Sequence, residues 1–248
     1  MAFPPRKDIA AVLTGHHEGD IKAVPGATLS PEQWPAEWLE VHYKDYSRLG
    51  PTIALEVGTS PDVTLADALA RRCSAERFDG KPLSVGMVET ALNNAVRERR
   101  PESGTSRAYP SAGALYPVEI YLLCTAVAPL ESGVYHYRAD RHELTLLFAE
   151  PKLGETMARI HGQDIGSPSM MIALSASLQR NSDKYGARGY RFALLEMGAC
   201  AFGLDLALTT EGMRTRWIGG FDDACLAEFL GISVDQELEL PTLLLAAG

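Results

Sequence analysis

A long apolar segment, residues 190–210, most limits how this chain can fold. The spacing predicts one helix with large apolar side chains on every side, and four small residues would let a neighbouring element approach closely: Gly198, Ala199, Ala201 and Gly203. A helix that is apolar all round is stable only when it is buried. Since one small domain seldom covers such a helix completely, we expect part of it to lie in a homodimer interface.

Length, composition and charge set the class of protein. A chain of 248 residues with 46% hydrophobic residues can bury the core of a globular domain. Its net charge of −9 provides no cationic face for nucleic acid or an anionic membrane, so we expect neither partner. No segment reaches the roughly 18 apolar residues of a membrane span, and the start of the chain shows no export signal. These features favour a cytoplasmic protein.

The cysteines are far apart and have no histidines at metal-ligand spacing. The sequence therefore indicates neither a metal site nor a disulfide framework. We expect small buried residues of a reducing compartment at Cys73, Cys124, Cys200 and Cys225.

Residues 1–60 are predicted to form an arm, and residues 61–248 the body. Prolines interrupt the arm and leave room only for short helices, such as one at 31–43. Its aromatic residues would expose too much apolar surface on a free tail, so the arm should pack on the body or on a partner subunit. These aromatic residues are Trp34, Trp38, Tyr43 and Tyr46. A flap over a peptide substrate is the alternative interpretation.

The body mixes predicted helices and strands. Helices are predicted at 64–72, 84–99, 152–161 and 222–230, with Ser84 as a cap. Strands are predicted at 118–125, 133–137, 143–148, 170–178 and 240–246. Short turns between neighbouring strands suggest antiparallel pairing. His136 is expected to be a surface or hydrogen-bonded strand residue, because no second ligand stands at metal spacing.

A turn of small residues, 107–117, precedes the first of these strands. Pro110 restricts its backbone, and Ser111, Ala112 and Gly113 carry almost no side chain. The exposed peptide groups of such a turn must pair with solvent, protein or a ligand. A planar heterocycle would suit this surface, although a plain turn before a strand has the same composition.

Two other stretches could bind an anion. Arg71, Arg72 and Ser74 follow a predicted helix, and guanidinium and hydroxyl groups can hold a phosphate. A cationic helix end that interacts with the helix dipole is the alternative. Gly219 and Gly220 leave backbone amides accessible, which is a weak signal by itself.

Lys184 and Tyr185 lie in a predicted polar loop, 180–191. A lysine in a partly dry site can lose its charge and take a proton, and a phenol can donate or accept one. A solvated loop without a chemical role is the alternative interpretation.

Together, these motifs resemble those of the SagB/McbC-type dehydrogenases, the azoline-oxidising branch of the nitroreductase-like flavoproteins. The resemblance runs from about residue 35 to the end of the chain. Its most specific part is the small-residue turn combined with the Lys-Tyr pair. The matching segments lie at 71–74, 82–84, 107–117, 133–137, 184–191 and 220–221.

The resemblance implies an α+β fold with a central antiparallel sheet flanked by helices, assembled as a homodimer with FMN at each interface. It assigns the phosphate and ribityl chain of FMN to Arg72 and Ser74. The flavin ring would lie on the turn at 110–113, with the amides of residues 219–220 on its other side.

The resemblance assigns the substrate proton to Lys184 and Tyr185. The implied activity is that of an FMN-dependent dehydrogenase or oxidase, which converts a thiazoline or oxazoline to the aromatic azole. The substrate would be a peptide or be tethered to a carrier, and other biosynthetic enzymes would be partners. Three alternatives stay open: an NAD(P)H-dependent nitro- or quinone reductase, a non-catalytic flavoprotein scaffold in a biosynthetic complex, and a different desaturation on a carrier-bound substrate.

Two features depart from the family pattern. Glu76 stands where a basic residue is usual, with Arg77 one step later. A carboxylate there would oppose a reduced anionic flavin, so either Arg77 replaces the basic residue through a local shift or the redox tuning differs. The chain also ends at Gly248 without a basic tail, which leaves Arg71 or Arg107 as the expected second cation for the phosphate.

Overall fold

The fold is built on a seven-stranded sheet. The computed structural model describes residues 29–99, 106–232 and 239–248. The strand order is β1-β7-β6-β4-β9-β11-β10, and every neighbouring pair is antiparallel. The strands are β1 Thr52–Ala54, β4 Val118–Cys124, β6 Gly133–Arg138, β7 Glu143–Ala149, β9 Met170–Ser177, β10 Thr215–Ile218 and β11 Glu239–Ala247. The predicted α+β class with a central antiparallel sheet is therefore confirmed.

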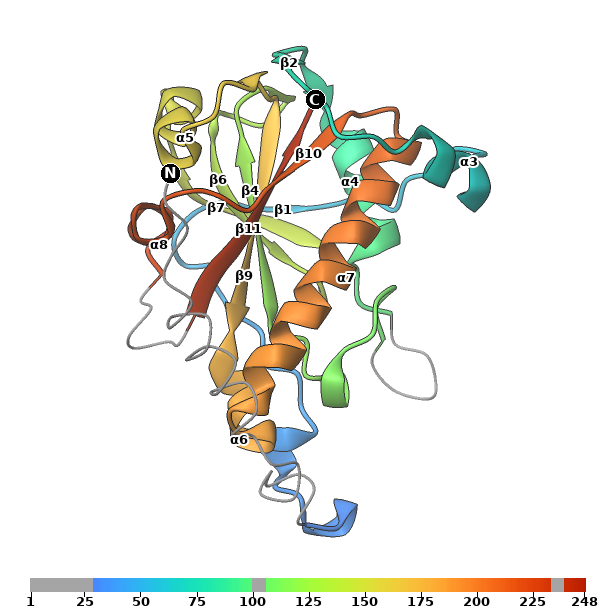
Figure 1. The fold of residues 1–248 in the computed structure, drawn as a ribbon, viewed down its shortest axis with the longest axis vertical. Helices are drawn as coiled ribbons and strands as arrows, with labels where there is room; N and C mark the ends of the chain where they lie inside the picture. Colours follow the sequence, from blue (N-terminus) through green and yellow to red (C-terminus); the bar gives the residue numbers. More distant parts are fainter. Residues whose placement is uncertain (1–28, 100–105, 233–238) are drawn as a thin grey trace, which may run out of the picture.

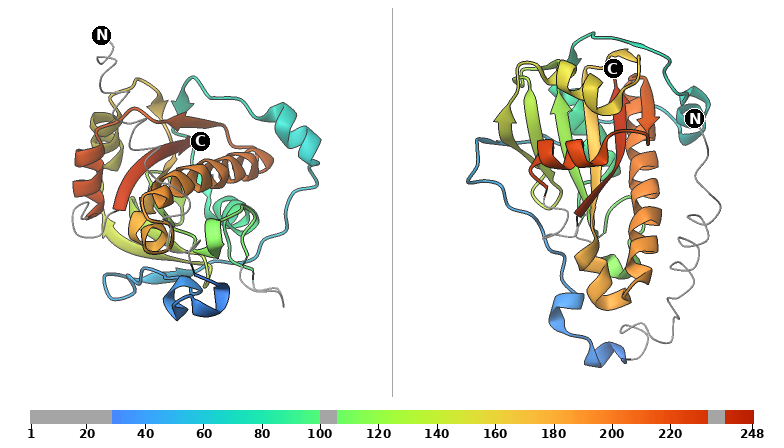
Figure 2. Two further views of the ribbon diagram at one scale, coloured as in Figure 1. Left: turned by 60° about the horizontal axis from the view of Figure 1, so that its bottom comes forward. Right: turned by 60° about the vertical axis from the view of Figure 1, so that its left-hand side comes forward.

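Helices cover both faces of this sheet (Figure 1, Figure 2). They are α3 Leu65–Arg71, α4 Val85–Ala95, α5 Leu153–His161, α6 Leu178–Tyr185, α7 Arg188–Thr210 and α8 Asp223–Leu230. Single turns of 3-10 helix occur at η2 Pro31–Gln33, η3 Ala36–Trp38 and η4 Ala112–Ala114. Two short parallel pairs complete the fold: β2 Phe78–Asp79 with β8 Gly166–Ser167, and β3 Leu83–Ser84 with β5 Val127–Ala128.

The core is divided by the central strand β4. Successive residues of a strand point to opposite faces of the sheet. Ile120 and Leu122 accordingly pack in the cluster formed with α4 and α7, whereas Tyr121 and Leu123 pack with α5 and α8. The predicted cap at Ser84 is present, since its side chain accepts a hydrogen bond from the amide of Gly86.

The predicted loop at 180–191 is wrong, because α6 and the start of α7 occupy it. The inward positions of α6 are the polar residues Asn181 and Lys184, so no apolar periodicity marks the helix. Gly189 lets the two helices meet: a side chain there would lie 2.8 Å from the carbonyl carbon of Asn181.

Two smaller predictions also need correction. The helix expected at 31–43 consists of η2 and η3 only, and Pro35 stands between them as the N-cap residue of η3. Cys73 and Cys225 are exposed, while Cys124 and Cys200 are buried as predicted.

The helix α7 is only partly covered by its own chain. It packs against α4, α6 and the sheet, but Leu195 is 66% exposed and Phe202 is also exposed. By length and composition it is also the one helix within the described ranges that could cross a membrane, and 56% of its most apolar window is buried, as in the core helix of a globular protein.

The described part of the predicted arm contacts the body at several points. Lys44 Nζ lies 2.5 Å from Glu239 Oε2 of β11, and the hydroxyl of Tyr46 lies 3.4 Å from that of Tyr121. The first 28 residues of the arm lie outside the described residues. The division into an arm of residues 1–60 and a body of residues 61–248 therefore stays a prediction.

Adding one methyl group at Gly189 tests the packing at the α6–α7 junction. Gly189→Ala places a Cβ against the backbone of Asn181 and Ser182, which cannot move aside as a flexible side chain can. We expect urea unfolding to show a loss of about 1–3 kcal/mol. The control is Gly203→Ala in the same helix, where the nearest atom would be Ala95 Cβ at 3.8 Å. It should leave stability unchanged or raise it by up to about 1 kcal/mol, and equal effects of the two variants would contradict the packing described.

Candidate active site

The small-residue turn and the Lys-Tyr pair meet at Gly113. This glycine has a left-handed backbone (φ 68°), which favours a residue without a side chain. A Cβ at Gly113 would lie 2.5 Å from the hydroxyl of Tyr185 and 3.0 Å from Lys184 Nζ. The structure therefore brings together two of the motifs that the sequence singled out.

Lys184 is held in a nearly dry position at the end of α6. It is 2% exposed, and its Nζ lies 3.9 Å from the centre of the Trp34 ring and 3.4 Å from the carbonyl oxygen of Trp38. Burial lowers the pKa of Lys184 and raises the pKa of Tyr185. An amine of this kind can accept a proton more readily than a solvated lysine.

A buried carboxyl on α7 is hydrogen bonded to the turn. Ser111 Oγ accepts a hydrogen bond from the amide of Tyr116 and donates one of 2.6 Å to Glu196 Oε2. Glu196 is 3% exposed, and burial raises its pKa to about 7 despite the Ser111 hydrogen bond and the charge of Arg107. Its Oε1 has no hydrogen-bond partner among the described residues.

A second buried carboxyl fixes the start of α6. Arg180 donates to the carbonyl of Tyr116 and to Glu119, and His136 Nε2 lies 2.7 Å from the other oxygen of Glu119. Although burial favours the neutral acid, Arg180 and His136 lower the pKa of Glu119 to about 2. The turn and α6 are thus joined by charged hydrogen bonds as well as by packing.

Arg107 contacts two tyrosines of the turn. Its Nη1 donates to the hydroxyl of Tyr109 at 2.9 Å, and its guanidinium lies 4.4 Å from the centre of the Tyr116 ring. A role for Arg107 as the second cation at the phosphate stays a prediction.

A separate cluster forms where α3 and β10 meet. Ser74 and Thr215 form a parallel bridge, and Arg72 Nη1 lies 3.8 Å from Asp205 Oδ2. Asp205 is buried on α7 and accepts hydrogen bonds from Thr215 Oγ1 at 2.5 Å and Trp217 Nε1 at 2.9 Å. Asp205 thereby ties Arg72 and β10 to the same helix.

Gly219 and Gly220 follow β10 and lie at the surface. No atom lies within 4 Å of the position that a Cβ would take at either residue. Arg71 is exposed on the last turn of α3. The guanidinium of Arg77, three residues after Ser74, pairs with Asp164 at 2.6 Å at the surface.

The elements that carry the site residues lie around α7: α6 is at one end of this helix, and α3 is at the other (Figure 1). We call Ser111, Gly113, Lys184, Tyr185 and Glu196 the turn half. We call Arg71, Arg72, Ser74, Gly219 and Gly220 the arginine half, in which Asp205 contacts Arg72 and the β10 residues Thr215 and Trp217. From Glu196 to Asp205, the two residues of α7 that contact these halves, the helix rises about 14 Å. Sequence reasoning missed Glu196 and Asp205, whose signal is an acidic residue inside an apolar helix.

Comparison with known proteins defines the family. The model of the Nitroreductase family matches residues 69–248. MJ1384 of Methanocaldococcus jannaschii, which is named as a nitroreductase, is 30% identical over 203 residues, or 81% of this chain and 98% of MJ1384. The chain belongs to the nitroreductase family, an oxidoreductase family whose members typically bind a flavin.

A second relative indicates which type of nitroreductase-family protein this chain resembles. The microcin B17-processing protein McbC of Escherichia coli is 29% identical over 170 residues, which span 66% of this chain and 61% of McbC. A chain of the E. coli microcin synthetase McbBCD complex, solved with truncated pro-MccB17 bound, has the same fold, with a TM-score of 0.64, 22% identity, and 99% of this chain and 94% of that chain covered. The predicted resemblance to the SagB/McbC type is confirmed.

The carboxyl of Glu196 should make stability depend on pH. Its pKa of about 7 in the folded protein lies above the value in an unfolded chain, so the folded state holds the extra proton between pH about 4.5 and 7. As pH rises through this range, ionisation of Glu196 therefore lowers the free energy of unfolding by up to about 3 kcal/mol. Glu196→Gln keeps an acceptor for Ser111 and should remove this loss.

The test is urea unfolding of the wild type and the variant at pH 5 and pH 7.5. The wild type should lose free energy of unfolding relative to Glu196→Gln as pH rises. Glu155→Gln, at an exposed position of α5, should follow the wild type. Parallel pH profiles for wild type and Glu196→Gln would show that Glu196 does not titrate in this range.

Proposed function

We propose that this protein is an FMN-dependent dehydrogenase of thiazoline or oxazoline rings, which it oxidises to azoles. The observation that carries the proposal is the meeting of Lys184, Tyr185 and Gly113 at one point. A proton acceptor and a phenol lie there beside a turn of small residues. This combination suits removal of a carbon-bound proton from a substrate that lies on a planar cofactor.

The chemistry of the two halves fits a flavin mononucleotide. Arg72 and Ser74 offer charge and a hydroxyl for one phosphate, and Arg71 is a further cation at the end of α3. The open backbone at Gly219 and Gly220 can approach one side of a flat ring, and the turn at Gly113 can approach the other.

We further propose that the flavin site forms between two copies of the chain. In one chain the two halves contact α7 at Glu196 and Asp205, about 14 Å apart along the helix. Leu195, Gly198 and Phe202 lie on its uncovered side, at the spacing of one helix face. A two-fold contact between two α7 helices in antiparallel orientation would place the turn half of one chain beside the arginine half of its partner.

In the proposed reaction, the bound flavin supplies the hydride acceptor. Lys184 would take the proton from the substrate carbon at its Nζ, since burial lowers its pKa. The hydroxyl of Tyr185 would orient the substrate and share the proton. Ser111, held by Glu196, would keep the turn in position for this transfer.

The substrate class follows from the relative McbC, which is named for processing microcin B17. By similarity, we propose a peptide substrate, or one tethered to a carrier, and association with other biosynthetic enzymes in the cytoplasm. An NAD(P)H-dependent reductase on the same fold is the competing function. It would be recognised by rapid bleaching of the flavin with NAD(P)H and no turnover of an azoline.

Replacing the Lys-Tyr pair tests the proposed chemistry. Lys184→Ala and Tyr185→Phe should each keep the flavin spectrum but lower the turnover of a thiazoline-containing peptide by roughly 10²–10⁴. If both act on one proton, the double variant should lose much less than the product of the single losses. Lys152→Ala, an exposed lysine, is the control. Near-normal turnover by both single variants would remove the pair from the mechanism.

Disrupting the uncovered side of α7 tests the assembly. Leu195→Arg should give a monomer that no longer retains flavin, because an arginine on the contact adds a charge that the partner cannot pair. Leu49→Arg changes a leucine of similar exposure, 63% against 66%, outside α7, and should leave both properties intact. Light scattering and the absorbance of the purified protein provide the measurement. A monomeric Leu195→Arg protein that stays yellow would refute the shared site.

A further inference from the structure

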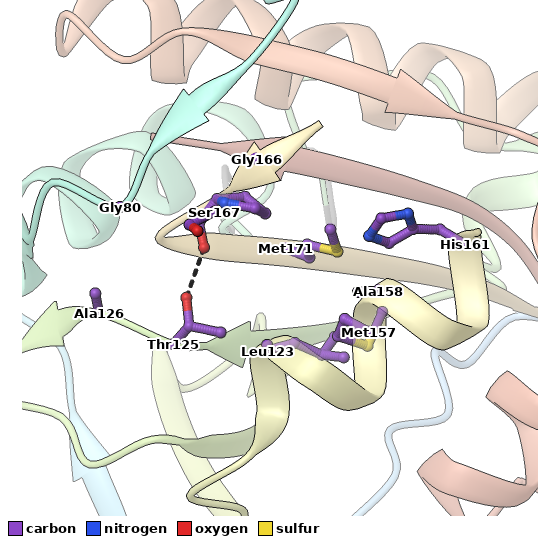
Figure 3. A pocket seen from close by; sticks show the side chains of 12 residues that line it. Gly80, Leu123, Thr125, Ala126, Met157, Ala158, His161, Gly166, Ser167 and Met171 are labelled. Atoms are coloured by element: carbon purple, nitrogen blue, oxygen red, sulfur yellow. Dashed lines mark hydrogen bonds between the residues drawn. The ribbon is translucent and has the colours of Figure 1, made fainter. Parts of the chain in front are cut away.

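A cleft of about 260 Å³ lies between α5 and the sheet (Figure 3). Its floor consists of the buried side chains of Leu123, Met157 and Met171. The rim carries little or no side chain, because it includes Gly80, Gly154, Ala158 and Gly166. The floor is therefore apolar, and the mouth is not blocked by side chains. No residue of the turn half or the arginine half lines this cleft.

One polar side chain points into this apolar space. His161 stands at the end of α5 with its ring turned toward Met171, and it is only 6% exposed (Figure 3). Its Nδ1 accepts a hydrogen bond from the amide of Gln163, so the ring proton resides on Nε2. Burial lowers the pKa of His161, which favours this neutral form. Within the described residues, no group accepts a hydrogen bond from Nε2.

The other polar groups of the cleft do not satisfy this donor. Thr125 lies in the cleft wall, and its hydroxyl donates to the carbonyl of Pro168 at 2.6 Å. Ser167 stands at the exposed rim. Nε2 is thus a donor at the cleft that none of these groups uses. A ligand that brings an acceptor into the cleft could take this hydrogen bond.

The volume and the lining of the cleft indicate which kind of molecule could fill it. An apolar cavity of about 150 Å³ holds one benzene ring, so this cleft has room for roughly two fused rings. The thioethers of Met157 and Met171 make favourable contacts with aromatic rings. We propose that the cleft is a binding site for a small planar aromatic molecule of about two rings, bearing a ring nitrogen or carbonyl that accepts a hydrogen bond from His161.

Two probe molecules of the same shape separate the contribution of the His161 hydrogen bond from that of the apolar contacts. Quinoline has two fused rings and an acceptor nitrogen, and naphthalene has the same rings without it. Calorimetric titration of the flavin-loaded protein should detect quinoline binding. In His161→Asn, the amide oxygen can replace Nδ1 as the acceptor for Gln163, but the Nε2 donor is lost. The ratio of quinoline to naphthalene affinity should then fall by roughly three- to tenfold.

A variant that fills the cleft tests whether quinoline binds there. Gly154→Leu places a side chain in the cleft without a clash, since its Cβ would meet only Thr125 Cγ2 at 4.0 Å. This variant should weaken quinoline binding at least tenfold. Glu155→Leu, on the same helix but not in the lining, should bind quinoline within about twofold of the wild type. An absence of quinoline binding to the wild type, unchanged binding to Gly154→Leu, or an unchanged affinity ratio in His161→Asn would overturn the proposal.

Discussion

Burying a carboxylate costs free energy unless its oxygens are hydrogen bonded or it becomes neutral, and α7 buries two. Asp205 meets this cost with hydrogen bonds from Thr215 and Trp217 and a longer contact to Arg72. Glu196 has one hydrogen bond, from Ser111, and its pKa rises to about 7. Each carboxyl therefore fixes the position of the loop or strand that supplies its donors. The two candidate half-sites are arranged around these two positions of one helix.

We propose that a single chain holds only part of the flavin site. The turn half offers a proton acceptor and a flat surface, whereas Arg71 and Arg72, the arginines proposed for the phosphate, lie in the other half. The arginine half offers Arg72 and open backbone at Gly219, but no group suited to accept a proton from carbon. Each half lacks what the other half supplies. This complementarity, with the uncovered side of α7, is the physical basis of the proposed dimer.

Much of the fold follows from local patterns in the sequence. The antiparallel strands β4, β6 and β7 were predictable because apolar residues and short turns define antiparallel pairs. The helix α6 was not predictable in this way, since its buried positions are Asn181 and Lys184. A helix whose inward face is polar carries no apolar period, and its packing depends on the contact of Gly189 with α6, which only the tertiary structure reveals.

The candidate site was predictable in part. The motifs identified the turn, the Lys-Tyr pair and the arginines, but spacing along the chain could not place them relative to one another. It also gave no sign that Arg107 turns inward or that Arg77 pairs with Asp164. Glu196 and Asp205 were overlooked because the surrounding apolar residues dominate the pattern of α7. A charged residue inside such a helix is a useful signal of a buried polar contact.

The most direct test of the account measures flavin binding by mixed dimers. Arg72→Glu damages the arginine half, and Gly113→Val damages the turn half, so each variant alone should be colourless. When the two are unfolded and refolded together, random pairing should give hybrids with one intact site, and flavin content should recover to roughly a quarter of the wild-type value. If each flavin were held by a single chain, every site in the mixture would keep one defect. No recovery of flavin would then contradict the shared site.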